Sequence, residues 1–336
     1  MMNPRCMSLV AAALLVACVV PVTAQQKLGD MVAEGGYEWI IGRWVATTDE
    51  GQKVEFKYDW VLDKHAVLAD VKMAEFNYRG LVMLAPGSEE IFDIGADNRG
   101  GLWKGTWSEG QGGLVHRVEH TSPDGQVRKA DIVYEKTDVD SVNIAMYGVD
   151  GSGSRNSDPW GKLTYKRQPA EATIAHAPAG QSRARDYQTL GDLVSEGGYD
   201  WLMGKWVATK EDRTYEVEYK PILDQHAAQA DVKIGDFKYF GIIMYVPARG
   251  EITQFGADSI GGIWKGTWEQ DDNDAANKIE YTKPDGTAVK IQHVYSKTDN
   301  DVMKVREYPV ETGGSRASQP REELTFKRQK AAAPQK

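Results

Sequence analysis

Cysteine is nearly absent from this chain and is confined to its N-terminal segment. The 336 residues contain two cysteines, Cys6 and Cys18. The rest of the chain therefore forms no disulfide and no thiolate site, and its fold depends on packing. The histidines show no pair at a spacing that suits zinc, so the sequence predicts no metal site.

Clusters of basic residues are also lacking. The formal net charge is −9, and no stretch gathers Lys and Arg into a patch. Nucleic acids and anionic membrane surfaces both favour clustered positive charge, so neither is expected as a partner. The sequence also has no phosphate-binding P-loop and no Gly-x-Ser-x-Gly nucleophile motif, which removes two common classes of enzyme.

A long apolar run occurs at the N-terminus, where it has the features of a secretory signal. Arg5 supplies the positive charge, a short apolar core follows, and Val22-Thr23-Ala24 forms a small-residue cleavage site. We expect residues 1–24 to be a signal peptide and the mature chain to be exported to the periplasm or the extracellular space, without inserting into a membrane. The alternative is a lipoprotein, because Leu15-Val16-Ala17-Cys18 resembles a bacterial lipobox and would leave a lipid anchor on Cys18.

The main feature that the chain does contain is a long internal repeat. The stretch GADNRGGLWKGTW begins at Gly95 and returns as GADSIGGIWKGTW 161 residues later, at Gly256. Such a repeat predicts a tandem duplication of one domain. We place the copies at residues 28–168 and 190–329, with an Ala/Pro-rich linker at 169–189 and a disordered tail at 330–336.

Each copy has the pattern of an antiparallel barrel. It opens with a short amphipathic helix that is broken at Gly35-Gly36 in the first copy. Apolar residues then alternate with charged ones, as in Val54, Phe56 and Tyr58, and turn signals leave room for about ten strands without crossover helices. The sequence predicts an all-β fold of two tandem up-and-down β-barrels, each preceded by a short α-helix; a two-sheet sandwich is the alternative.

Both copies resemble calycins at their ends. Gly42-Arg43-Trp44 and Gly204-Lys205-Trp206 begin the first strands, and Arg167 and Arg328 end the last ones. The resemblance implies that Trp44 and Trp206 close a barrel end and that each Arg stacks on the indole of its copy. The strand number and the Gly-rich repeat are also similar to the lipocalin-like DUF1579 family and, more distantly, to nitrobindins.

The resemblance to nitrobindins does not extend to haem. Nitrobindins bind haem through a histidine in a late strand, but the first copy has no histidine between His120 and His176. His293 of the second copy corresponds to Ile132 in the first. We therefore expect no haem and no other cofactor.

Aromatic residues shared by the copies are the candidate ligand site. Trp103 and Trp107 lie on one face of a strand and return as Trp264 and Trp268. Tyr58 and Tyr219 also fall at inward positions of a matched strand. An aromatic wall suits a ring-shaped or apolar ligand, although the same side chains also serve as ordinary core. We expect non-catalytic binding of a small hydrophobic or aromatic molecule in one or both barrels.

Two histidine turns carry the alternative functions. Asp63 and His65 lie between the second and third strands, and Asp224 and His226 occupy the same turn in the second copy. At a barrel mouth the histidines would contact a ligand or, with the aspartates, act as acid/base residues of an enzyme. The same pattern also fits turn aspartates that accept backbone N–H groups and histidines packed at the rim. A third hypothesis is a cell-envelope interaction module whose barrels are filled.

The Gly-rich turn of the repeat is a further candidate. Asp97 and Asp258 lie in the shared pattern Gly-Ala-Asp-x-x-Gly-Gly. Its backbone N–H groups could bind an anion, but a tight hairpin needs such glycines without any ligand.

Overall fold

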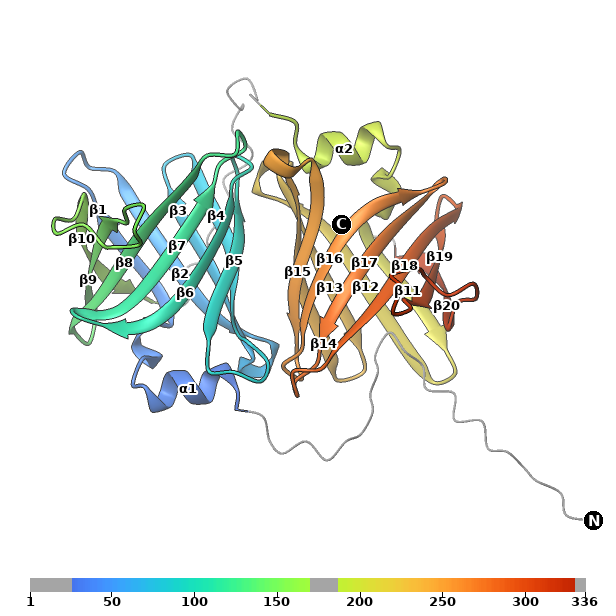
Figure 1. The fold of residues 1–336 in the computed structure, drawn as a ribbon, viewed down its shortest axis with the longest axis horizontal. Helices are drawn as coiled ribbons and strands as arrows, with labels where there is room; N and C mark the ends of the chain where they lie inside the picture. The colour runs from blue at the N-terminus through green and yellow to red at the C-terminus, as the bar shows by residue number, and fades with distance from the viewer. Residues whose placement is uncertain (1–25, 170–186, 330–336) are drawn as a thin grey trace, which may run out of the picture.

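The computed structural model describes residues 26–169 and 187–329. They form two closed antiparallel barrels of ten strands each, in which every strand pairs with its neighbours in sequence and the first pairs with the last (Figure 1). The expected tandem barrels are confirmed, and the sandwich alternative is excluded because both sheets close. The signal segment with Cys6 and Cys18, most of the linker and the tail lie outside the described residues.

The elements of the two copies correspond one to one. Barrel 1 consists of α1 (Leu28–Glu34), β1 (Gly42–Thr47), β2 (Lys53–Val61), β3 (Ala66–Met73), β4 (Phe76–Leu84), β5 (Ile91–Asp97), β6 (Leu102–Gly110), β7 (Gly113–Thr121), β8 (Val127–Asp138), β9 (Ser141–Gly148) and β10 (Gly161–Gln168). Barrel 2 consists of α2 (Leu190–Glu196), β11 (Gly204–Lys210), β12 (Arg213–Ile222), β13 (Ala227–Ile234), β14 (Phe237–Val246), β15 (Glu251–Asp258), β16 (Ile263–Asp271), β17 (Asp274–Thr282), β18 (Ala288–Asp299), β19 (Val302–Pro309) and β20 (Glu322–Arg328). Short 3₁₀ turns lie between some of them, at η1 (Glu38–Ile40), η2 (Leu62–Lys64), η3 (Asp200–Leu202), η4 (Leu223–Gln225) and η5 (Pro247–Arg249).

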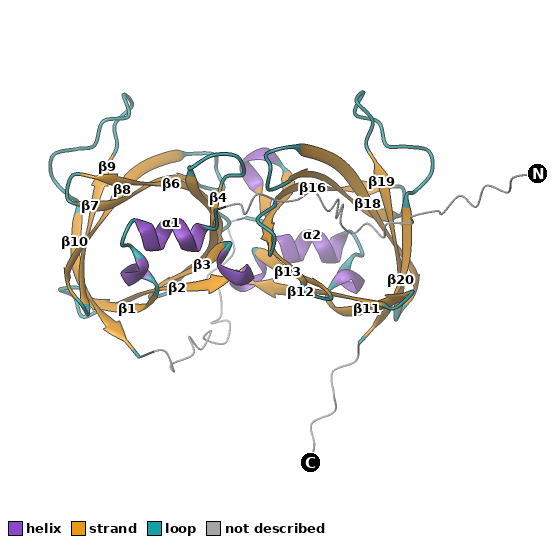
Figure 2. Cartoon of the chain, turned by 90° about the horizontal axis from the view of Figure 1, so that it is seen from below, coloured by secondary structure: helices purple, strands orange, loops and turns teal. Residues whose placement is uncertain are grey.

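Each short helix lies across one end of its own barrel, as the view along the barrels shows (Figure 2). The two helices lie at opposite ends of the molecule, because the barrels run in opposite directions (Figure 1). In α1, Leu28, Met31 and Val32 fall on one face at the i, i+3 and i+4 positions and pack on the barrel core. The helix stops at Gly35, and Gly36 then adopts a left-handed φ of 71°. No helix in the described part of the chain is long and apolar enough to cross a membrane.

One end of each barrel is closed by a tryptophan and an arginine. The Trp44 side chain is fully buried and donates from Nε1 to the Ile40 carbonyl, 3.0 Å away. The Arg167 guanidinium lies 4.3 Å from the centroid of that indole, and its Nη1 donates to the Ile41 carbonyl at 2.8 Å. Barrel 2 repeats this arrangement with Trp206 and Arg328, at 4.2 Å. The guanidinium therefore stacks on the tryptophan that closes the barrel, and its hydrogen bonds hold the turn that leads into the first strand.

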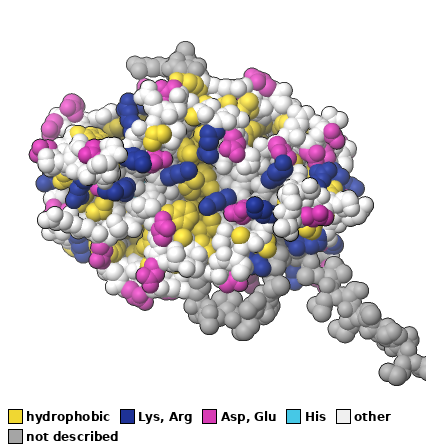
Figure 3. Space-filling view, viewed as in Figure 1, with side chains coloured by type: hydrophobic (Ala, Val, Ile, Leu, Met, Phe, Trp, Pro, Cys, Tyr) yellow, Lys and Arg dark blue, Asp and Glu magenta, His cyan; other side chains and the backbone are white. Residues whose placement is uncertain are grey.

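The barrels pack against each other through their outer faces. Leu81 and Met83 of β4 meet Ile242 and Met244 of β14 in one buried cluster. This explains why these strands are apolar at consecutive positions: their inward side chains face a barrel core and their outward ones face the other barrel. The contact between the two outer faces is called the seam. Figure 3 shows the apolar side chains along it, with Lys and Arg on both sides.

The turns that precede β3 and β13 have unusual backbone conformations. Leu62, Asp63 and Lys64 have φ values of 52°, 54° and 71°, and the second copy repeats this left-handed turn. Three consecutive non-glycine residues with positive φ are costly. The turn is held by the other barrel, since Asp63 pairs with Lys238 at 3.1 Å and η2 packs on β14.

Candidate functional site

The first barrel contains a cavity between its short helix and the strand ends. Its volume is about 210 Å³. Leu28, Met31 and Val32 cover it from the helix, while Tyr58 and Trp107 reach it from the barrel. The lining is apolar except near the opening, which makes it suitable for an apolar guest.

The second barrel has the same cavity in a larger form. Its volume is about 670 Å³, and every residue that lines the cavity of barrel 1 has its counterpart in this lining. The cavity also extends to Gly250 and Glu251, beside η5. One cause of the larger volume is the side chain at the strand β3 position, where Val67 is replaced by Ala228.

A tyrosine and a tryptophan form the floor of each cavity, and a second tyrosine lies behind them. In barrel 1 the Tyr58 ring meets Trp107 edge-on at 6.0 Å, and the Tyr58 and Tyr134 hydroxyls lie 3.1 Å apart. Burial raises the pKa of the Tyr58 hydroxyl far above its ordinary value, so the floor carries no charge at neutral pH. Tyr219 and Trp268 meet in the same way in barrel 2, at 6.3 Å. The matched aromatic residues Tyr58, Trp107, Tyr219 and Trp268 therefore all lie on cavity walls.

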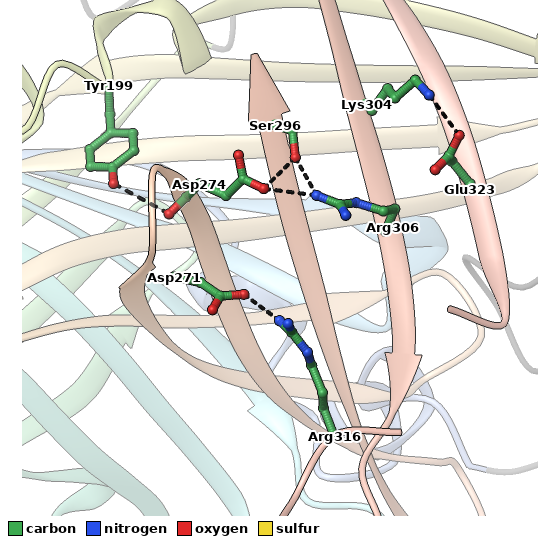
Figure 4. A network of polar contacts seen from close by, with 8 residues as sticks. All are labelled: Tyr199, Asp271, Asp274, Ser296, Lys304, Arg306, Arg316 and Glu323. Atoms are coloured by element: carbon green, nitrogen blue, oxygen red, sulfur yellow. Dashed lines mark hydrogen bonds and ion pairs between the residues drawn. The ribbon is translucent and has the colours of Figure 1, made fainter. Parts of the chain in front are cut away.

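The rim of the cavity is fixed by a tyrosine in both copies. The Tyr37 hydroxyl donates to the Glu109 carboxylate at 2.8 Å, and burial together with this hydrogen bond raises the pKa of Tyr37 to about 12. In barrel 2, Tyr199 donates instead to the backbone carbonyl of Asp274 at 3.3 Å. The carboxylate of Asp274 is in turn held by Ser296 and Arg306 (Figure 4). Each rim thus joins the segment after the helix to the end of the barrel.

Beneath the floor of barrel 1 lies a buried polar group that the sequence analysis missed. The Asp93 carboxylate accepts hydrogen bonds from Trp107 Nε1 at 3.1 Å and from the Tyr78 hydroxyl at 3.3 Å. It also lies 2.6 Å from His116 Nε2, and the other ring nitrogen of His116 has no partner. Gly105 separates the strands that carry these residues, and a Cβ there would meet both polar side chains at 2.2–2.3 Å.

The signal that would have found this group is a difference between the copies. The positions of Asp93 and His116 are occupied in barrel 2 by Gln254 and Asn277. Both pairs lie across a glycine of the WKGTW motif, and a glycine inside a strand marks a close approach of other groups. The two barrels therefore share their apolar cavity but differ in the polar groups behind it.

Trp103 and Trp264 lie deeper than the cavity floor. Trp103 donates to the Asp97 carboxylate at 2.7 Å and stacks at 4.3 Å on His120. Trp264 donates to Asp258 and lines a small inner chamber of barrel 2. Of the tryptophans expected to bind ligand, Trp107 and Trp268 therefore face the large cavities and Trp103 does not line the cavity of barrel 1.

The Gly-rich turn uses its own aspartate as the anion. Asp97 Oδ1 accepts from the backbone N–H groups of Arg99 at 2.8 Å and Gly101 at 2.9 Å. Burial works to raise the pKa of Asp97, but hydrogen bonds from His120, Trp103 and these N–H groups outweigh it and lower the pKa. In barrel 2, burial prevails and the pKa of Asp258 is raised. The N–H groups of this turn are thus already engaged.

The two histidine turns lie where the barrels meet. His226 Nδ1 is within 3.3 Å of the position that a Cβ on Gly100 of barrel 1 would occupy, and Asp224 accepts from Asn98 at 3.0 Å. His65 is half-buried beside the other barrel, and burial together with the charge of Lys27 lowers its pKa. Neither histidine lines the three cavities described for the two barrels. The turns lie at the barrel ends that the short helices cover, since Lys27 Nζ donates to the Asp63 carbonyl at 3.4 Å and α2 contacts η4. The histidines nevertheless do not face a cavity, because the left-handed turns direct these side chains toward the other barrel.

His293 in barrel 2 is part of a buried charged group. Its Nε2 lies 3.2 Å from Glu307, which also accepts from Arg321 Nε at 2.8 Å. Across residues 26–169 and 187–329, no three His, Cys, Asp or Glu side chains are grouped so that they could hold a metal ion.

Comparison with known proteins adds little to this geometry. No model of a protein family and no curated protein matches the chain. Among solved structures, the chain is similar to a protein of unknown function from the DUF3598 family of Nostoc punctiforme PCC 73102. That similarity has 11% sequence identity and a TM-score of 0.20, and it covers 86% of this chain and 96% of the other. A score this low carries no argument, so the tandem barrel fold rests on the two closed sheets described above.

Proposed function

We propose that this protein binds a small hydrophobic or aromatic molecule in the cavity beneath each short helix and performs no chemistry on it. The observation that carries the proposal is the duplicated cavity, whose lining positions are the same in both barrels. Packing alone does not require two copies to leave the same space open, because cores are normally filled to high density.

The walls support an uncharged, partly aromatic ligand. Trp107 and Trp268 present ring surface, and the buried tyrosines stay neutral because burial raises their pKa. The larger cavity lies within the range of about 300–1,000 Å³ that is usual for small-molecule sites. The volume of about 210 Å³ in barrel 1 suits a smaller guest.

We propose binding without catalysis because the histidine turns do not face the cavities. An enzyme that used His65 or His226 with Asp63 or Asp224 would need them beside the bound molecule. Asp63 and Asp224 instead contact side chains of the neighbouring barrel, and neither histidine lines a cavity described for the two barrels. The resemblance of both copies to lipocalin-like DUF1579 barrels supports a binding role.

Native mass spectrometry of the chain from Gln25, compared with the same sample after denaturation, tests the proposal directly. We expect bound mass that is lost on denaturation, with up to two molecules per chain. Titration with the neutral aromatic probe N-phenyl-1-naphthylamine should show two sites, and Ala228→Phe, which places a ring inside the cavity of barrel 2, should weaken one of them. Val139→Phe, at an exposed hairpin position, is the matched control and should keep both. A protein that binds neither a native molecule nor the probe would contradict the proposal.

We also propose that the chain is exported, with cleavage after Ala24. The support is the sequence of residues 1–24, and the alternative is a lipid anchor on Cys18. The intact mass of the protein isolated from its source cells distinguishes an N-terminus at Gln25 from a lipidated Cys18. An intact mass that still includes residues 1–24 would exclude both.

A further inference from the structure

Barrel 2 contains a second, smaller chamber beyond the floor of its large cavity. Its volume is about 60 Å³, enough for about four water molecules or a small polar group. Gln254, Asn277 and His293 place polar atoms on its wall. Tyr219 lines both the chamber and the large cavity, so the two spaces adjoin at this ring.

Trp268 fixes the direction of the hydrogen bonds that Gln254 and Asn277 make in the chamber wall. An indole N–H can only donate, so Gln254 must present its Oε1 to Trp268 Nε1, which is 2.8 Å away. The Nε2 of Gln254 then donates to the Tyr239 hydroxyl at 2.7 Å. Asn277 must present its Nδ2 to the same Gln254 oxygen, at 2.8 Å.

This chain of donors leaves one acceptor without a partner. Asn277 is 1% exposed, and its Oδ1 receives no hydrogen bond. A buried acceptor that loses its water and gains no donor is unfavourable. The chamber therefore offers an uncharged acceptor to any group that enters it.

The corresponding part of barrel 1 carries different chemistry. There Asp93 supplies a carboxylate and His116 an imidazole in place of the two amides. The neutral amide acceptor is thus a property of barrel 2.

We propose that barrel 2 binds an amphipathic alcohol, whose apolar body fills the large cavity and whose hydroxyl donates a hydrogen bond to Asn277 Oδ1. This inference rests on the proposed function and adds the class of ligand. A hydroxyl fits better than an ammonium group, because a neutral donor satisfies the amide oxygen without the burial of a new charge. For the hydroxyl to reach Asn277, the Tyr219 ring that lies between the two spaces has to turn aside.

The test compares decan-1-ol with 1-fluorodecane, which has a similar size but no hydrogen to donate. Isothermal titration of the full mature chain, carrying Val67→Phe to obstruct the cavity of barrel 1, gives the ratio of the two affinities at barrel 2. Different hydration of the two probes cancels when this ratio is compared between proteins. We expect the ratio to fall about tenfold in Asn277→Leu, the effect of one lost hydrogen bond.

Two further variants serve as controls, and both should keep the affinity ratio of the parent. Asn277→His should keep the alcohol preference, because His116 occupies the same place in barrel 1 and leaves one ring nitrogen without a partner. Asn300→Leu makes the same chemical change at an exposed hairpin and should leave the ratio unchanged. If Asn277→Leu does not fold, a crystal structure of the decan-1-ol complex gives the answer: the hydroxyl oxygen should lie within hydrogen-bonding distance of Asn277 Oδ1.

The outcomes separate this inference from the proposed function. Binding of both probes with the same ratio in the parent and in Asn277→Leu, or a hydroxyl placed away from Asn277, overturns the inference and leaves the apolar binding site in place. Absence of binding by either probe overturns both for barrel 2.

Discussion

The Nε2 atom of His116 lies 2.6 Å from a carboxylate oxygen of Asp93 in the interior of barrel 1. Barrel 2 replaces this acid–imidazole pair with the amides of Gln254 and Asn277 and keeps the tryptophan that donates to it. A duplicated domain has thus kept its apolar cavity and changed the polar group beneath it. The predictions below test this difference and the contacts that support the two cavities.

Replacement of the Asp93–His116 pair should cost less stability than the two single replacements added together. Asp93→Gln alone leaves His116 without a carboxylate, and His116→Asn alone leaves Asp93 with one donor fewer in a buried site. We expect each single variant to lower the free energy of unfolding by about 2–4 kcal/mol. The double variant, which recreates the barrel 2 pair, should cost less than the sum. Urea denaturation of all four proteins gives the coupling, and strict additivity would contradict a direct interaction.

Gly105 should not accept an alanine. Its Cβ would lie about 2.2 Å from His116 Nε2, so the pair across it would have to separate. We expect Gly105→Ala to lower the free energy of unfolding by about 1–3 kcal/mol through overpacking. Gly151→Ala is the control, since nothing lies within 4 Å of that position, and its change should stay within about 0.5 kcal/mol. Equal effects of the two variants in thermal unfolding would show that a Cβ at position 105 does not clash with its neighbours.

The closing arginine should not be replaceable by lysine. Arg167 stacks on Trp44 and donates to two backbone carbonyls at once, and an ammonium group cannot keep this flat, forked geometry. We expect Arg167→Lys to lower the free energy of unfolding by about 1–3 kcal/mol. Arg128→Lys, at an exposed strand position, should be neutral. Chemical denaturation measures both, and a neutral Arg167→Lys would mean that the stacked guanidinium contributes little.

Loss of one side chain at the seam should weaken the contact between the barrels. Ile242 is fully buried although it points out of its own barrel, and it packs in the cluster that the two barrels share. We expect Ile242→Ala to cost about 2–5 kcal/mol, as for other buried aliphatic residues. Because the cost falls on the interface, calorimetry should show one transition for the parent and a broadened or split transition for the variant. One sharp transition at an unchanged temperature would contradict a stabilising seam.

His65 should make the stability of the fold depend on pH. Its pKa is lowered by burial and by Lys27, so the unfolded chain binds a proton there more readily than the folded one. The stability that His65 contributes is present above the ordinary histidine pKa of about 6.5 and is lost as the pH falls through the lowered value. His65→Gln, which has no proton to gain, should lose less stability between pH 7.5 and pH 5 than the parent. Urea midpoints across this range decide the matter, and parallel curves for the two proteins would rule out His65 as the source.

The tandem barrels could be predicted from sequence because their signals are local. Alternation along a strand, as in Val54, Phe56 and Tyr58, reports which face is buried, and a repeated motif reports a repeated domain. The aromatic floor followed from the same alternation, since Trp107 and Tyr58 occupy inward positions of their strands. The copies themselves supplied the comparison that no single domain would have given.

The rest was decided by tertiary structure. Asp93 and His116 lie on β5 and β7 with another strand between them, so their contact depends on register and on the space above Gly105. The histidine turns contact the opposite barrel because the two barrels pack antiparallel through the outer faces of β4 and β14. The consecutive apolar residues of these strands indicate burial on both faces but do not say which surface covers the outer one. Sequence by itself determines which residues a strand turns inward. Only the closure of each sheet and the packing of the two barrels bring distant strands together, since those contacts depend on geometry that no local pattern contains.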